Sequence, residues 1–511
     1  MIGLRILFAG VASWFSRGMS ILLGLVLMPV LFRHLAKEEL GMWLLLAQSW
    51  AALALLDFGF GMILTRRIAL TLGQSGLGIG GELNQHAIDK TCDLVATGQR
   101  VYRWLALVAL IVSLGSGFFY LRCLGLRDLS VHRVCLAWGV LCFSQALGIS
   151  AAVWTCLLQG VGYVGWDAIL VSLVNSLTLL IQLLLVLLGG GLVSLASAAA
   201  AGALTQRFLI VWFMRARRSE LFMQRGRWRA DLFREMVPPS FRAWLTSAGY
   251  LLVANTDQFF IAARNGTSAI PAYRAAFLLI INLHFLAGVF SGASQVFVTH
   301  LWQAGDLGQI QLILKRNARI GLLAMGCGAG AILALGPTLF ELWLGPGNFV
   351  GYPVLGIFLA TFILEHHANV FGSCGRATDD EAYAVSSIAS GILKLGFAFV
   401  LTVRFGLTGL ALSTLIAQAL TNDWFMVYRS LHRLGIRFLD HVQDVLVPCL
   451  LMFIAALGLG FLAHNSVREQ GLVIRVATVS AVAAMLLCGS LWTLALNASQ
   501  RSRILRRVRF V

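Results

Sequence analysis

Charged residues are scarce in this chain, at 12% of 511 residues, against about a quarter in soluble domains. Hydrophobic residues make up 59% instead. No polar segment is long enough to form a soluble domain with its own core. This shortage of charge excludes a soluble globular protein and predicts an all-α, polytopic membrane protein.

Motifs for chemistry are missing as well. The nine Cys are scattered without a CxxC pair, which predicts free thiols rather than disulfides or a metal site. The sequence contains no GxxxxGK[ST] motif and no Ser/His/Asp or Cys/His constellation. His366 and His367 are adjacent and face different directions, which disfavours a metal site. We therefore expect no enzyme, no metal and no cofactor apart from a coupling ion.

Apolar runs of about twenty residues recur from one end of the chain to the other. We expect about fourteen transmembrane helices. Their approximate limits are 6–32, 41–64, 103–121, 134–158, 166–188, 191–213, 243–263, 270–298, 320–344, 353–377, 382–403, 406–428, 445–464 and 472–496.

Basic residues gather between these runs, most densely over residues 215–242, which hold eight Arg. Lys and Arg beside membrane helices stay on the cytoplasmic side, and an even number of spans returns both termini to that side. We therefore explain the net charge of +17 by membrane topology and by contact with anionic membrane lipid, and not by binding of nucleic acid.

An internal repeat joins the two halves of the sequence. Residues 191–205 align with 406–421, and the same offset pairs Gly160 with Gly375. An even number of spans separates the copies, so the repeats share one orientation and a pseudo-twofold axis along the membrane normal should relate them. We expect an N-terminal six-helix lobe (1–213), a basic cytoplasmic linker (214–242), a C-terminal six-helix lobe (243–428), two extra transmembrane helices (429–496) and a basic cytoplasmic tail (497–511).

Ionisable residues inside the spans are the candidate functional groups, because each is costly at the bilayer centre unless it faces protein or water. The cations are Arg17, Arg207, Arg274 and Lys394, and the carboxylates are Asp57, Asp257 and Glu365. Polar neighbours at helical spacing suggest that several face a central cavity. Other interpretations stay open: Asp57 could pair with Arg66 or Arg67, Arg274 could snorkel, and mid-span charges could form a buried ion pair.

Short motifs give a family resemblance. They are FRHLAKEELGMW at 32–43, LLDFGFG at 55–61, LLQG at 157–160, AGD at 304–306 and LWLG at 342–345. With these motifs the chain resembles the polysaccharide transporter family, the O-antigen-type flippases of the multidrug/oligosaccharidyl-lipid/polysaccharide exporter superfamily. It departs from the family at Pro271, where Gly is usual.

The resemblance implies a flippase of the bacterial inner membrane. Such a protein moves undecaprenyl-diphosphate-linked oligosaccharide from the cytoplasmic to the periplasmic leaflet, for O-antigen or exopolysaccharide synthesis, with a polysaccharide polymerase as a candidate partner. The lobes would alternate access, coupled to protons or Na⁺ as an antiporter. The alternatives are a drug or cation exporter of the same superfamily and a non-transporting membrane component of a polysaccharide assembly complex.

The same resemblance gives each candidate residue a role. The four cations, Arg17, Arg274, Lys394 and Arg207, would bind the diphosphate. The three carboxylates, Asp57, Asp257 and Glu365, would couple transport to the ion. The aromatic residues proposed to stack against sugars are Trp154, Tyr250 and Tyr273.

Overall fold

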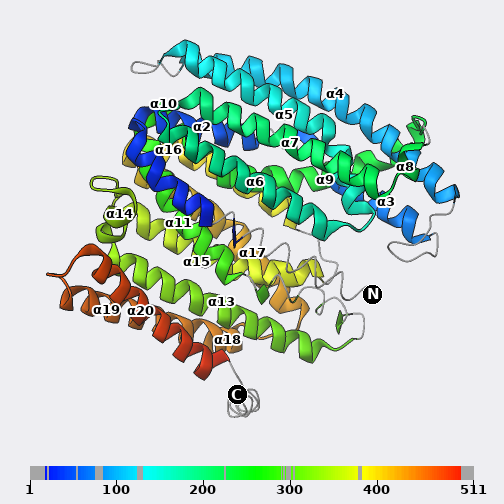
Figure 1. Cartoon of the computed structure of the whole chain (residues 1–511). Helices are drawn as coiled ribbons and strands as arrows, with labels where there is room; N and C mark the ends of the chain where they lie inside the picture. Colours follow the sequence, from blue (N-terminus) through cyan, green and yellow to red (C-terminus); the bar gives the residue numbers. More distant parts are fainter. Residues whose placement is uncertain are drawn as a thin grey trace, which may run out of the picture. The chain divides into compact units, whose positions relative to one another are not determined.

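The computed structural model describes residues 18–19, 22–52, 56–74, 85–123, 130–223, 226–288, 290–291, 294, 298, 301–302, 305–377 and 383–495. Over these residues every regular element is a helix and there is no strand (Figure 1). The predicted all-α fold is confirmed.

Two compact units divide the chain, Met1–Pro271 and Ala272–Val511. The first holds α2 (Lys37–Ala52), α3 (Phe60–Gln74), α4 (Gln85–Cys123), α5 (Val131–Gly160), α6 (Val164–Leu187), α7 (Leu192–Arg217), α8 (Glu220–Met223), α9 (Ala230–Asn255), α10 (Asp257–Asn265) and η2 (Thr267–Ala269). The second holds nearly all of α11 (Ile270–Ala287), then α13 (Leu307–Leu335), α14 (Pro337–Leu344), α15 (Tyr352–Ala377), α16 (Tyr383–Leu420), α17 (Asn422–Arg433), α18 (Phe438–His441), η3 (Val442–Leu446), α19 (Val447–Ser466), α20 (Leu472–Ser490) and η4 (Leu491–Ala495). The expected lobe limits stay a prediction.

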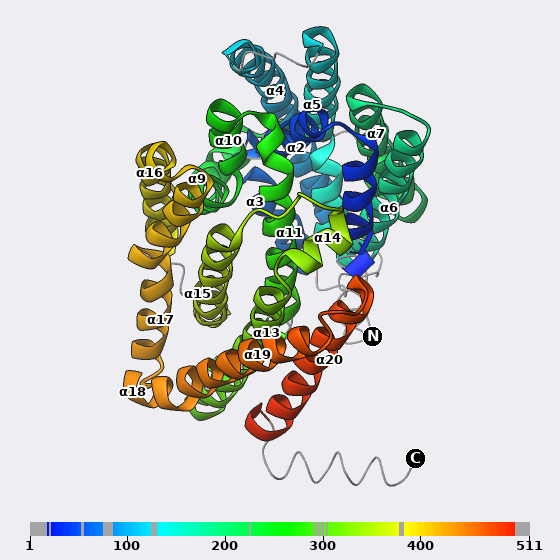
Figure 2. The ribbon, with the colours of Figure 1, turned by 90° about the vertical axis from the view of Figure 1, so that its left-hand side faces the viewer.

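Each unit has a core of its own. In the first, α5 packs against α4 and α7 around residues such as Leu64, Tyr102 and Val153. In the second, α13 packs against α15, α19 and α20, and Figure 2 shows α13, α19 and α20 side by side. Phe371 and Leu323 are fully buried there.

Ten helices among the described residues are long and apolar enough to cross a membrane. They coincide with all the expected spans except the first, second and seventh. Ten helices account for the remaining spans because one of them, Val385–Arg433, contains two. Of the first span, Leu22–His34 is described and is a shorter apolar helix. The protein is a multi-pass membrane protein.

The second expected span, 41–64, is interrupted by a turn between α2 and α3. Phe58 has a φ of 51° and Gly59 a φ of 68°, a left-handed conformation that ends the helix. A non-glycine residue held in this region costs of order 1–3 kcal/mol, so its surroundings must stabilise the turn. Phe58 stacks on Trp244, with ring centroids 5.3 Å apart.

The seventh expected span, 243–263, is divided between α9 and α10 at Thr256. α9 begins well before that span and contains the adjacent Pro238 and Pro239. Proline has no amide hydrogen, so the carbonyls of Arg234 and Glu235 lack their usual donors within the helix.

The predicted repeat has a counterpart in the helices. Gly191 immediately precedes α7, and Gly406, with a φ of 57°, is the non-helical residue at which α16 divides. The second pair, Gly160 and Gly375, shares a closely packed environment. A Cβ at Gly160 would meet the Ile68 side chain, and a Cβ at Gly375 would meet the Tyr383 hydroxyl.

The Arg-rich linker is bound to α4 within the first unit. The amide of Arg227 donates to Asp93 Oδ1 at 2.7 Å, and the amide of Arg229 donates to Thr97 at 3.1 Å. The Arg229 guanidinium hydrogen-bonds to Asp231 and thereby lowers the pKa of that carboxyl to about 2. Linker arginines therefore hold local structure, and the topological role expected of them stays a prediction.

Candidate functional site

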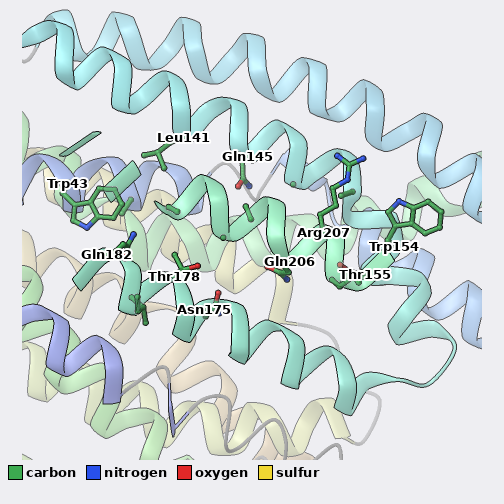
Figure 3. Close-up of a pocket in the computed structure, with 18 residues that line it drawn as sticks. Trp43, Leu141, Gln145, Trp154, Thr155, Asn175, Thr178, Gln182, Gln206 and Arg207 are labelled. Atoms are coloured by element: carbon green, nitrogen blue, oxygen red, sulfur yellow. The ribbon is translucent and has the colours of Figure 1, made fainter. Parts of the chain in front are cut away.

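A polar cavity of about 510 Å³ lies inside the first unit, between α2, α5, α6 and α7 (Figure 3). Its main polar lining side chains are Gln145, Thr155, Asn175, Thr178, Gln206 and Arg207. Among the described residues that line it there is no carboxylate. The cavity therefore offers amides, hydroxyls and one cation to a ligand.

Small residues of α7 leave space for this cavity. Ala199, Gly202 and Ala203 line it, and they belong to the alanine-rich segment that the sequence repeat had marked. A Cβ at Gly202 would collide with the side chain of Thr178 on α6. The close approach of α6 and α7 at this point thus requires glycine.

The lining amides are available for binding. Within the part of the chain that the structure describes, Gln145, Asn175 and Gln206 make no hydrogen bond to protein, whereas Gln182 donates to the Leu195 carbonyl at 3.2 Å. Neutral amides both donate and accept hydrogen bonds, as do hydroxyl groups. Such a lining suits a ligand rich in hydroxyl and amide groups.

Aromatic side chains lie at both ends of the cavity. Figure 3 shows Trp43 and Gln182 toward one end, and Trp154 with Arg207 toward the other. Trp154 had been predicted to face a sugar, and the structure places it in the lining. Trp43 was missed, although it lies in the motif at 32–43.

The other two aromatic candidates do not line this cavity. Tyr273 is 2% exposed and packs edge-on against Phe358, with ring centroids 4.9 Å apart, so it belongs to the core of the second unit. Tyr250 is 52% exposed on α9.

The predicted cations do not all gather in this cavity. Arg207 lines it, while Arg274 and Lys394 belong to the second unit. Arg274 lies over the ring of Phe277 at 4.8 Å, and Lys394 on α16 is fully buried. Arg17 lies outside the described residues.

Two carboxylates of the second unit are electrostatically coupled. Glu365 on α15 interacts with Asp423 on α17 and with the side chain of Asn369, one helical turn along α15. Both Asp423 oxygens are buried without a hydrogen-bond partner, as is the side-chain oxygen of the adjacent Asn422. Sequence reasoning missed Asp423, although it is an ionisable residue inside the expected span 406–428.

The other two predicted carboxylates lie in the first unit. Asp57 accepts a hydrogen bond at 3.3 Å from the Gly61 amide and interacts with the Tyr102 hydroxyl. The alternative pairing of Asp57 with Arg66 or Arg67 is not what the structure shows, because Arg67 pairs with Glu235 at 3.2 Å. Asp257 is buried at the start of α10.

The adjacent histidines face different neighbours. His367 Nε2 lies 2.8 Å from His441 Nε2, whereas the His366 ring contacts the ring of His284 with centroids 5.2 Å apart. Among the described residues, no group of three or more His, Cys, Asp or Glu side chains could hold a metal ion.

Solved structures resemble this arrangement of helices, although no family model and no curated protein matches the sequence. The lipid II flippase MurJ in an inward closed conformation aligns with a TM-score of 0.68 and 13% identity, over 95% of this chain and 98% of its own. An inward-facing multidrug resistance MATE family transporter of the MOP superfamily aligns with a TM-score of 0.61 and 13% identity, over 83% and 99%.

A third similar structure is a MOP superfamily transporter from Pyrococcus furiosus, with a TM-score of 0.58, 15% identity and coverage of 84% and 95%. Its binding pocket was described as having a reverse polarity that suggests a different function. The chain has the fold of these transporters. Within this transporter fold, the alignment to MurJ covers 95% of the chain and that to the MATE structure 83%.

Proposed function

We propose that this protein flips an undecaprenyl-diphosphate-linked oligosaccharide from the cytoplasmic to the periplasmic leaflet of the bacterial inner membrane. The product would serve O-antigen or exopolysaccharide synthesis. The fold is that of transporters, including a lipid II flippase, and the alignment to that flippase covers more of this chain than do the alignments to the two MOP transporters described above.

The chemistry of the cavity carries the proposal. Free amides of Gln145, Asn175 and Gln206 match the hydroxyl and acetamido groups of sugars, and the two tryptophans offer faces for sugar rings. Arg207 supplies a charge-assisted contact for a phosphate. With both chain ends cytoplasmic, Arg207 lies toward the cytoplasmic end of α7, where a substrate headgroup would enter.

A drug or cation exporter is the second candidate, because MATE structures share the fold. A cavity that binds a cation would be expected to carry a carboxylate, and the described lining of this cavity holds Arg207 and no carboxylate. The lining therefore favours the anionic, sugar-containing substrate.

Deleting the gene in its own host tests the function. We expect loss of surface polysaccharide and accumulation of lipid-linked repeat units on the cytoplasmic side, both restored by the wild-type gene. Sensitivity to cationic dyes with normal polysaccharide would instead identify an exporter. Normal polysaccharide, normal lipid-linked intermediates and normal dye resistance would contradict both forms of transport.

Ion coupling is assigned to Glu365 and Asp423 in the second unit. The two carboxylates interact electrostatically and repel each other when both are ionised, so a bound proton or Na⁺ relieves the repulsion. The buried, unpartnered oxygens of Asp423 and Asn422 suit a cation that prefers oxygen ligands. The diphosphate roles of Arg17, Arg274 and Lys394, and coupling through Asp57 or Asp257, remain parts of the proposal.

Isosteric neutralisation tests this coupling. Glu365→Gln and Asp423→Asn are each expected to remove the acceleration of flipping by an imposed proton or Na⁺ gradient in proteoliposomes, because the cation loses a charged ligand. The matched control is Glu341→Gln, an exposed residue of α14. Retained gradient dependence in both variants would exclude this pair as the coupling site.

A further inference from the structure

A second cavity, of about 540 Å³, lies on the first unit between α3, α4 and α9 and shares no lining residue with the polar cavity. Aromatic rings dominate its walls. They belong to Phe58, Phe60, Trp104, Trp228, Phe233 and Phe241. We refer to it as the aromatic groove.

The rim of the aromatic groove is unusually exposed for aromatic residues. Trp104 is 63% exposed, Phe241 52% and Phe58 39%. Apolar surface of this kind on a membrane protein is covered by hydrocarbon, because its exposure to water is unfavourable. An apolar chain therefore fits between these rings.

Two polar groups line the aromatic groove, and neither has a protein partner that satisfies it. Ser240 is 4% exposed, and its hydroxyl has no hydrogen-bond partner. A buried hydroxyl without a partner costs about 1–3 kcal/mol, which a ligand oxygen in the groove would remove. This hydroxyl points to a ligand that is not purely hydrocarbon.

Arg100 is the second polar group. Its guanidinium lies over the Trp228 ring at 5.3 Å, which fixes it at the rim. Among the described residues no carboxylate lies within ion-pair distance of Arg100. The nearby carboxylates pair with other arginines: Asp93 and Asp231 with Arg229, and Glu235 with Arg67. Arg100 is therefore available to an anion.

The surroundings of the aromatic groove carry an excess of positive charge. Eight cations oppose four carboxylates on residues 60–74, 85–105 and 226–241. The cations are Arg66, Arg67, Lys90, Arg100, Arg103, Arg227, Arg229 and Arg234, and the carboxylates are Asp89, Asp93, Asp231 and Glu235. These cations lie in segments that the topology assigns to the cytoplasmic side. Basic pockets at that side of membrane helices bind anionic lipid headgroups.

We propose that the aromatic groove binds one anionic phospholipid of the cytoplasmic leaflet. An acyl chain lies between the aromatic rings, the lipid phosphate accepts hydrogen bonds from Arg100, and the Ser240 hydroxyl donates to a glycerol-ester oxygen. This site is separate from the proposed substrate cavity and does not depend on what the protein transports.

Native mass spectrometry of the full-length, detergent-purified protein tests the site. Titration with phosphatidylglycerol should give one bound lipid, retained about tenfold more tightly than phosphatidylcholine: both lipids carry the phosphate, but the choline cation of the second is repelled by Arg100 and the surrounding excess of cations. Arg100→Gln should remove this preference. Arg103→Gln, an equal loss of charge on an exposed neighbour outside the groove, should keep it.

A second variant fills the groove without changing its charge. Val237→Trp places a ring in the space for the acyl chain and should abolish the bound lipid, so the test stands even if Arg100→Gln fails to insert. Equal binding of both phospholipids by the wild type would overturn the proposal. So would displacement of phosphatidylglycerol by equimolar undecaprenyl phosphate, which would identify a polyprenyl chain as the occupant.

Discussion

Replacing Arg207 by Gln is expected to reduce flipping by about tenfold to a hundredfold. Arg207 is the single cation among the described residues that line the polar cavity. A hydrogen bond to a charged group contributes about 1.5–3 kcal/mol, and each 1.4 kcal/mol is a factor of ten. Gln keeps a polar side chain but neither the charge nor the planar fork that binds two phosphate oxygens.

Flipping of a fluorescent polyprenyl-diphosphate glycan in proteoliposomes measures this effect. Arg207→Lys should lie between the wild type and Gln, because it keeps the charge and loses the fork. The matched control is Arg217→Gln on the same helix, where the side chain is exposed and lies over Phe213. Wild-type rates for Arg207→Gln would remove this cavity from the transport path.

Gly41→Ala is expected to cause a large loss of stability through a single added methyl group. A Cβ at Gly41 on α2 would overlap the backbone carbonyl of Thr267 in η2. A backbone atom cannot swing aside as a side chain can, so the helix and the turn must separate. Overpacking of this kind costs typically about 1–3 kcal/mol, and a backbone clash lies at the upper end.

Thermal unfolding in detergent tests the prediction, with Gly115→Ala as the matched control. Gly115 lies inside α4, and nothing is within 4 Å of a Cβ built there. The control should be neutral or slightly stabilising, because alanine favours a helix over glycine. Equal stability of the two variants would contradict the close approach of α2 and η2.

Hydropathy predicted the helices because membrane spans are set by length and apolar content along the chain. The span expected at 353–377 is α15 almost residue for residue, and the repeat correctly placed the glycines that begin α7 and divide α16. The turn at Phe58 escaped prediction because residues 41–64 as a whole are apolar enough for a span, although Asp57 and Gly59 beside Phe58 could have marked a break.

Interactions between side chains on different helices could not be predicted in the same way. Helical spacing identifies neighbours on one helix, such as Glu365 and Asn369, but not the electrostatic interaction of Glu365 with Asp423 on another. For the same reason Arg66 and Arg67 were considered as alternative partners of Asp57, nearby in sequence, whereas the structure pairs Arg67 with Glu235 on α9.

The proline pair of α9 links the shape of that helix to the aromatic groove. Without two backbone hydrogen bonds, α9 bends at Pro238 and Pro239 more easily than an uninterrupted helix. Phe233 lies before the prolines and Phe241 after them, and both line the groove. A lipid that binds one bent conformation of α9 more tightly than another shifts the equilibrium between the two by its difference in binding free energy. The lipid composition of the bilayer therefore affects the conformation of this helix.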